Sequence, residues 1–149
     1  MRFRASLVLV LLLAIFVFAF GTKARAGENV WSGLVMATNA PRPPVPPMEM
    51  RHIAGTLSRT FGYNYFNLIG QSRKTLESGE ENWMARSKHF SLRVDARGVV
   101  RNGYRLNLQL FQDRQVLLET DATLSKSSPL VIRGPQIGAG QLLLLLIVE

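Results

Sequence analysis

The 149-residue chain contains no cysteine and only two histidines. The lack of cysteine excludes a disulfide scaffold, a thiol enzyme and a zinc module with cysteine ligands. The two histidines, His52 and His89, have none of the H-x-x-H, H-E-x-x-H or H-x-H spacings, so no metal site is encoded locally. The chain also lacks a G-x-S-x-G nucleophile elbow and an S-x-x-K motif. We therefore predict no catalytic residue, no metal site and no cofactor, and we favour a protein that is not an enzyme.

Apolar residues are concentrated at the N-terminus. Two arginines near the start precede a continuous apolar run over residues 7–20, and an A-x-A site follows at residues 24–26. This order is typical of a secretory signal peptide, which we place at residues 1–26 with cleavage before Gly27. The alternative is an uncleaved membrane anchor, but the apolar run is shorter than the about 20 residues that a spanning helix needs. We expect a bacterial type of export and a periplasmic or extracellular location.

The charge of the chain changes once the signal peptide is set aside. The whole sequence has 18 basic and 10 acidic residues, a net charge of +8, and residues 1–26 hold four of the basic residues and no acidic one. The remaining chain, residues 27–149, therefore has a net charge of +4. A specific nucleic-acid partner loses most of its support at this charge. We expect this remaining chain to form a single domain.

The prolines of the chain are concentrated in residues 40–48, which contain five of the seven. Such a segment favours an extended polyproline II conformation and excludes a helix. We interpret it as a stiff spacer, with docking onto an aromatic groove as the alternative. The residues that follow, 49–60, show the periodicity of an amphipathic helix that ends at Gly62. Its apolar face comprises Met50, Ile53, Ala54, Leu57 and Phe61.

Most of the remaining chain follows the two-residue period of strands. We predict Asn102-Gly103 as a hairpin turn and residues 77–82, 95–98, 112–114 and 133–140 as further turns. Residues 63–70 are apolar on both sides and predict an interior strand, and residues 142–148 predict a strand that is buried on both faces. The other strands are predicted at residues 30–37, 83–86, 89–94, 104–111, 115–124 and 130–132.

The order of these elements predicts an α+β fold. We expect a mostly antiparallel β-sheet or sandwich of about six or seven strands, with one amphipathic helix packed on it. The all-β class with an incidental helix is the near alternative.

Two sets of residues are candidates for binding. Strand alternation places Arg93 and Arg105 on the solvent side of a sheet, where guanidinium groups suit an acidic polymer, anionic headgroups or a protein. The aromatic cluster that includes Tyr63 and Tyr65 could form a stacking platform, and its alternative is a place in the core.

Three functional hypotheses remain from the sequence. The preferred one is an exported, non-enzymatic binding or accessory module of a cell-envelope assembly, with a protein partner. If residues 142–148 lie at a sheet edge, they offer that partner an unpaired strand. The first rival is a small secreted hydrolase that uses His52 or His89 with an acid in a concave pocket. The second is a carrier that holds an apolar ligand in a cavity of several hundred Å³ inside the β-core.

Overall fold

The computed structural model describes residues 27–149, so the predicted signal peptide lies outside the described residues. Within the described residues, no helix is long and apolar enough to cross a membrane. The elements, in chain order, are β1 (Glu28–Thr38), the 3-10 helix η1 (Met48–Met50), α2 (Ala54–Phe61), β2 (Tyr65–Leu76), β3 (Asn82–Arg86), β4 (Phe90–Val100), β5 (Gly103–Gln112), β6 (Gln115–Ser125), β7 (Leu130–Ile137) and β8 (Gly140–Val148).

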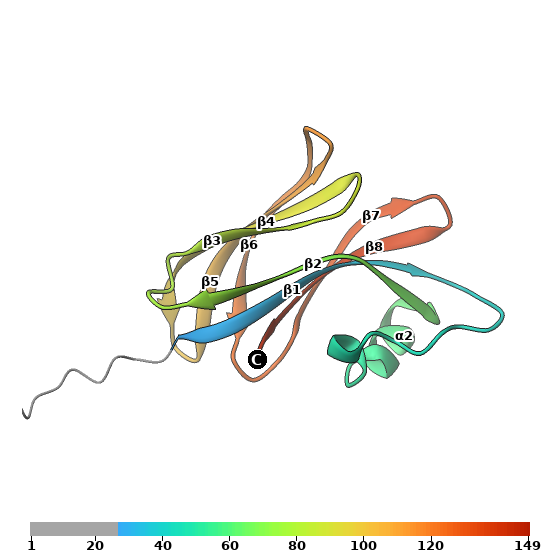
Figure 1. The fold of residues 1–149 in the computed structure, drawn as a ribbon, viewed down its shortest axis with the longest axis horizontal. Helices are drawn as coiled ribbons and strands as arrows, with labels where there is room; N and C mark the ends of the chain where they lie inside the picture. The colour runs from blue at the N-terminus through green and yellow to red at the C-terminus, as the bar shows by residue number, and fades with distance from the viewer. Residues whose placement is uncertain (1–26) are drawn as a thin grey trace, which may run out of the picture.

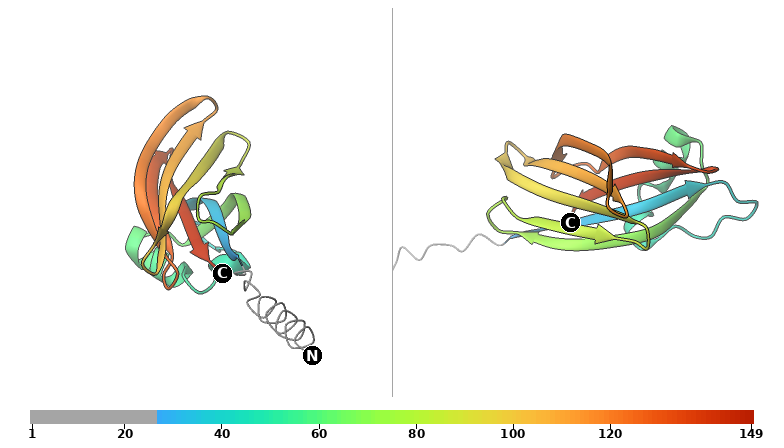
Figure 2. Two further views of the ribbon diagram at one scale, coloured as in Figure 1. Left: turned by 90° about the vertical axis from the view of Figure 1, so that its left-hand side faces the viewer. Right: turned by 90° about the horizontal axis from the view of Figure 1, so that it is seen from above.

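The eight strands of residues 27–149 form two four-stranded antiparallel sheets. The strand order is β2-β1-β8-β7 in the first, which we call sheet A, and β3-β4-β5-β6 in the second, which we call sheet B. Strands of both sheets run along the length of the molecule, and α2 lies on the side of sheet A that faces away from sheet B (Figures 1 and 2). The predicted antiparallel α+β architecture with one helix is confirmed, with eight strands in place of six or seven.

The main hydrophobic core lies between the two sheets. Each strand of sheet B contributes its alternate apolar residues to this core, while the residues between them face outward. Because of this alternation, the sequence of β5 shows a regular two-residue period of apolar residues. The fully buried residues of this core include Val30, Leu34, Leu92, Val94, Leu106, Leu108, Leu110, Leu124, Leu142, Leu144 and Leu146.

A second hydrophobic core covers the outer face of sheet A. Trp31 and Val35 of β1 and Leu143 and Leu145 of β8 pack there against η1 and α2. The helical segment contributes Met50, Ile53 and Leu57. Strands β1 and β8 are therefore buried on both faces, which confirms the prediction for residues 142–148 and explains their continuous apolar sequence.

One predicted strand position is wrong, and the condition set for residues 142–148 is not met. Strand β8 pairs with both β1 and β7, so residues 142–148 lie inside sheet A and offer no free edge to a partner. Strand β2 pairs with β1 at the edge of sheet A, although residues 63–70 were expected to form an interior strand. The segment is apolar on both sides because Phe66 contacts the second core and Ile69 the main core. Burial on both faces does not distinguish a central strand from an edge strand.

The remaining corrections concern boundaries. The helix begins at Ala54 rather than near Glu49, because residues 48–50 form a 3-10 helix directly after the prolines, but it ends at Gly62 as predicted. Residues 95–98, expected to turn, belong to β4, where Gly98 forms a bulge at φ +136°. Residues 133–140, expected as a long turn, are mostly strand β7. The hairpin turn at Asn102 is confirmed, with φ 58°.

Candidate functional site

The outer face of sheet B is the surface on which strand alternation placed the predicted binding arginines. Arg93 on β4 and Arg105 on β5 are both exposed there. The ladder pairs Arg93 with Gln109, which lies four residues along β5 from Arg105. At about 3.3 Å per residue, this offset separates the two arginines by about 13 Å along the strands. The structure therefore confirms their shared face but does not bring them into one site.

A different pair of arginines does share a groove. Strand register places Met84 opposite Arg93 and Arg86 opposite Ser91, so all of these side chains project from the outer face. An open groove of about 330 Å³ lies among Asn82, Trp83, Met84, Arg86 and Arg93. We call this the arginine groove. The sequence shows both arginines, but only the β3–β4 register reveals that they line the same groove.

The arginine groove is not neutralised by acidic side chains. Among the ion pairs of the described residues, none involves Arg86 or Arg93 within 4.0 Å of a carboxylate. The Arg86 Nη2 atom instead donates to Met84 Sδ at 3.2 Å. The guanidinium groups therefore keep donors available for an anionic ligand.

This face carries acidic residues on two strands: Asp95 of β4 lies opposite Asn82, and two more lie on β6 at the other side. Glu119 and Asp121 of β6 project beside Asn107, whose Nδ2 donates to Asp121 Oδ1 at 2.9 Å and to Glu119 Oε1 at 3.4 Å. In the ladder, Gln109 stands between Arg93 and Glu119. We call the side over β3 and β4, which carries Arg86, Arg93 and Arg97 together with Asp95, the basic half of the face, and the side over β6 the acidic half.

The aromatic candidates lie on the other sheet. Tyr65 starts β2 at the edge of sheet A, and Tyr63 is half-buried against the second core. Phe61 belongs to the same core, and the Arg133 guanidinium carbon lies 5.2 Å from the centroid of its ring. Tyr63 and Tyr65 therefore do not join Arg93 and Arg105 in one site, and Tyr63 contributes to the core.

His52 lies in an open groove beside the end of β8. The groove has a volume of about 340 Å³, and its polar lining includes Glu49 and Glu149. Both carboxylates bind Arg73, at 3.4 Å and 3.0 Å, and the hydrogen bond that Arg73 donates to Glu149 is the main cause that raises the pKa of Arg73. Among the described residues, His52 makes no hydrogen bond to a carboxylate or a hydroxyl group.

His89 lies in the turn between β3 and β4, next to the turn between β5 and β6. Its Nδ1 atom is 3.8 Å from Asp113 Oδ1, and the two side chains are 59% and 73% exposed. This pair lies on the open surface, whereas the hydrolase hypothesis requires a concave pocket. Within residues 27–149, no three histidine or acidic side chains are grouped so that they could hold a metal ion.

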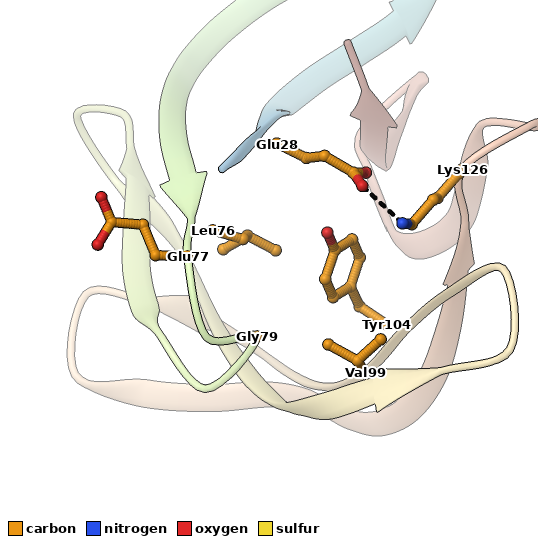
Figure 3. A pocket seen from close by; sticks show the side chains of 7 residues that line it. All are labelled: Glu28, Leu76, Glu77, Gly79, Val99, Tyr104 and Lys126. Atoms are coloured by element: carbon orange, nitrogen blue, oxygen red, sulfur yellow. Dashed lines mark hydrogen bonds and ion pairs between the residues drawn. The ribbon is translucent and has the colours of Figure 1, made fainter. Parts of the chain in front are cut away.

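A small cavity opens between the sheets at one end of the sandwich. The Tyr104 ring lies between Leu76 and the ion pair of Lys126 with Glu28, and its hydroxyl end points toward that pair (Figure 3). The Nζ–Oε1 distance of the ion pair is 2.5 Å, and Nζ lies 5.7 Å from the centroid of the Tyr104 ring. The cavity has a volume of about 30 Å³, which holds about one water molecule. It is therefore too small for the apolar ligand of a carrier.

No protein-family model, curated protein or solved structure matches this chain. No functional residue can therefore be transferred to it from another protein. Of the surfaces described above, the arginine groove combines two features that a binding site requires, an open concave shape and hydrogen-bond donors that the chain itself leaves available.

Proposed function

We propose that the protein is an exported, non-enzymatic binding module of a cell-envelope assembly, and that it holds a protein partner through the arginine groove. The observation that carries this proposal is the pairing of Arg86 and Arg93 in one open groove without a carboxylate partner among the described residues. The order of charged, apolar and small residues in the first 26 positions supports export.

The chemistry of the groove favours a partner that presents aspartate or glutamate side chains. A guanidinium group is planar and can donate two parallel hydrogen bonds to one carboxylate. Two guanidinium groups in one groove select for a pair of carboxylates and disfavour a basic surface, because like charges brought together repel. The acidic half of the same face, at Glu119 and Asp121, restricts the orientation of such a partner.

The groove rests on a rigid support. Trp83 is buried beneath it, and its indole Nε1 donates to Ser32 Oγ of β1 at 3.0 Å. This bond joins β3 of sheet B to the centre of sheet A. The backbone that carries Arg86 is therefore fixed before a partner arrives, which reduces the conformational entropy that binding costs.

Site-specific photo-crosslinking in the cells that make the protein tests the proposal. A crosslinking amino acid at Asn82, which lines the arginine groove, should capture a discrete protein, whereas the same group at the exposed Thr56 of α2 should not. The double substitution Arg86→Gln and Arg93→Gln should reduce the captured amount by at least about tenfold, because the loss of even one hydrogen bond between charged groups costs about 1.5 kcal/mol.

A matched pair on the same face supplies the control. Arg97→Gln with Arg105→Gln removes the same charge from the far end of the basic half and should leave the crosslinked product unchanged. Equal loss with both double variants would show that only net charge matters and would refute the groove. The intact mass of the exported protein tests the export step, because processing before Gly27 removes residues 1–26.

A further inference from the structure

Three of the four edge strands in residues 27–149 are short, interrupted or covered. Strand β3 has only five residues. Strand β7 has a bulge after Arg133 that contains Pro135, so its regular ladder begins with only four residues. Strand β2 has a bulge at its centre, and just beyond it Gly70 lies against β3, where an added Cβ atom would be 2.5 Å from the Arg86 carbonyl oxygen. Short strands, bulges, prolines and covered edges prevent pairing with another chain.

Strand β6, at the other edge of sheet B, differs from these three. A bulge at Leu117 interrupts its start, and residues 118–125 then pair one-to-one with β5. This stretch contains no proline, glycine, lysine or arginine. Within the described chain, its main chain makes no hydrogen bond to any strand other than β5. The N–H and C=O groups that point away from β5 are therefore available to an added strand. We call residues 118–125 the β6 edge.

The two faces of the β6 edge differ in chemistry. On the inner face, Leu118 and Ala122 pack against the main core but are only partly buried, because no further strand covers them. On the outer face, Glu119 and Asp121 are both exposed. Neither forms an ion pair with another described residue, and the hydrogen bonds that they accept from the neutral Asn107 amide leave their charge in place.

We propose that the β6 edge binds an extended segment of a partner protein as a fifth strand of sheet B, and that basic side chains alternate with apolar ones in this segment. Main-chain hydrogen bonds hold the segment, and its apolar residues extend the main core over Leu118 and Ala122. Its lysine or arginine side chains pair with Glu119 and Asp121, because residues opposite each other on adjacent strands have Cβ atoms about 5 Å apart.

The same charges disfavour a second copy of this chain as the occupant. If the β6 edges of two copies paired about a two-fold axis, Glu119 and Asp121 of both copies would lie side by side. Like charges opposite each other destabilise a sheet, and charged edge residues commonly prevent such self-pairing. A strand with basic residues instead gains from both carboxylates.

This inference goes beyond the proposed function and does not depend on it. The arginine groove lies over β3 and β4, whereas the β6 edge lies at the opposite margin of sheet B. The groove repels a basic segment and the β6 edge attracts one. The two surfaces therefore differ both in place and in the charge that they bind.

A seven-residue synthetic peptide in which lysine alternates with valine tests the β6 edge on the purified exported protein. Three matched peptides serve as controls. In the first the lysines and valines are grouped in two blocks, in the second glutamate replaces lysine, and in the third every main-chain nitrogen is methylated and cannot donate to a neighbouring strand. Titration calorimetry should give an affinity for the alternating lysine peptide that is at least about tenfold higher than for each control.

The controls also define the results that would overturn the proposal. Equal affinity for the block peptide would show that charge alone attracts the ligand. Equal affinity for the methylated peptide would show that no strand is added, and so would a dissociation constant of the alternating peptide above about 1 mM. Hydrogen exchange adds the location, because the bound peptide should slow exchange at residues 118–125 and leave β2, β3 and β7 unchanged. Protection of another edge would refute the site.

A pair of double variants tests the two carboxylates. Glu119→Gln with Asp121→Asn should weaken the alternating peptide by at least about tenfold. The new amide oxygens still accept from Asn107, and equal thermal unfolding curves confirm that the fold is kept. Glu77→Gln with Glu80→Gln, in the exposed turn between β2 and β3, removes the same charge and should leave the affinity unchanged. No loss with the first pair, or equal loss with both, would contradict the proposal.

A last variant separates the two proposals. Arg86→Gln with Arg93→Gln should not weaken the peptide, although it should reduce the adduct at Asn82 that tests the arginine groove. Loss of the adduct alone therefore bears on the arginine groove, and loss of peptide binding with the Glu119 and Asp121 variant bears on the β6 edge. If the arginine substitutions abolish peptide binding, the peptide does not bind at the β6 edge and the inference is wrong.

Discussion

The two sheets have similar apolar inner faces, but their outer faces differ in polarity. Both contribute leucine and valine to the main core. Outside, sheet A is covered by η1 and α2, whereas sheet B carries arginine, asparagine, glutamine and acidic side chains. The sequences of their central strands reflect this difference. Residues 142–146 of β8 are all leucine, while β5 alternates leucine with polar residues. A continuous apolar strand marks a face that the chain covers itself, and an alternating strand marks a face left open to solvent or a partner.

The largest expected effect comes from comparing one substitution on the outer face of sheet A with one on the outer face of sheet B. Leu145→Ala removes a fully buried side chain beneath the helical segment and should lower the free energy of unfolding by about 2–5 kcal/mol. Gln109→Ala, on the outer face of sheet B, should change it by less than about 0.5 kcal/mol. Urea unfolding measures both values. Equal costs would contradict the distinction between a covered and an open face.

The hydrogen bond between the sheets, from Trp83 to Ser32, should have the next largest effect. Ser32→Ala removes the acceptor of the Trp83 indole N–H in a buried position, and an unsatisfied buried donor costs about 1–3 kcal/mol. Ser127→Ala, in the exposed turn before β7, is the matched control with an effect near zero. If the Ser32 variant also weakens crosslinking from Asn82, this hydrogen bond positions the arginine groove as well as stabilising the fold. An unchanged unfolding midpoint would show that this bond contributes nothing.

The turn between β2 and β3, one of the two turns that connect the sheets, depends on one carboxylate. Burial raises the pKa of Glu81, but hydrogen bonds from the Ser78 and Glu77 N–H groups outweigh this effect and lower it to about 2. Because the folded pKa lies below the ordinary value of 4.5, the stabilisation is present above pH 4.5 and is lost as pH falls toward 2. Glu81→Gln should lower the free energy of unfolding by about 1 kcal/mol at neutral pH, and it should reduce the loss of stability between pH 4.5 and pH 2. Unfolding curves measured between pH 6 and pH 2 check both effects. The same pH dependence of stability in the wild-type protein and the variant would refute the role of Glu81.

The smallest effect is expected at the edge of sheet A. Arg73 pairs with Glu49 and Glu149 and is half-exposed, so Arg73→Gln should lower the free energy of unfolding by less than any of the destabilising substitutions above. High salt should reduce that difference because it screens exposed charges. A larger, salt-independent loss would indicate that the pairing positions η1 on the sheet. Unfolding curves at low and high salt distinguish these results.

The residues themselves explain which features could be predicted. The alternation of β4 and β5 follows from burial of one face, so the outward placement of Arg93 on β4 and Arg105 on β5 was predictable. The arginine groove was not, because it depends on the register that sets Met84 opposite Arg93, and register arises from contacts between strands. Strand β2 illustrates the same limit, since its edge position follows from pairing partners and not from its own residues.

The order of strands in sheet A also constrains how the chain folds. Sheet B consists of successive hairpins, so each of its strands pairs with a neighbour that has just been made. The central ladder of sheet A instead joins β1 to β8, the first and last strands of the described chain. Until residues 140–148 emerge from the ribosome, Trp31 and Val35 have no β8 beside them. We therefore expect this domain to stay incompletely folded during synthesis and to close late, in a single step that depends on the arrival of its final strand.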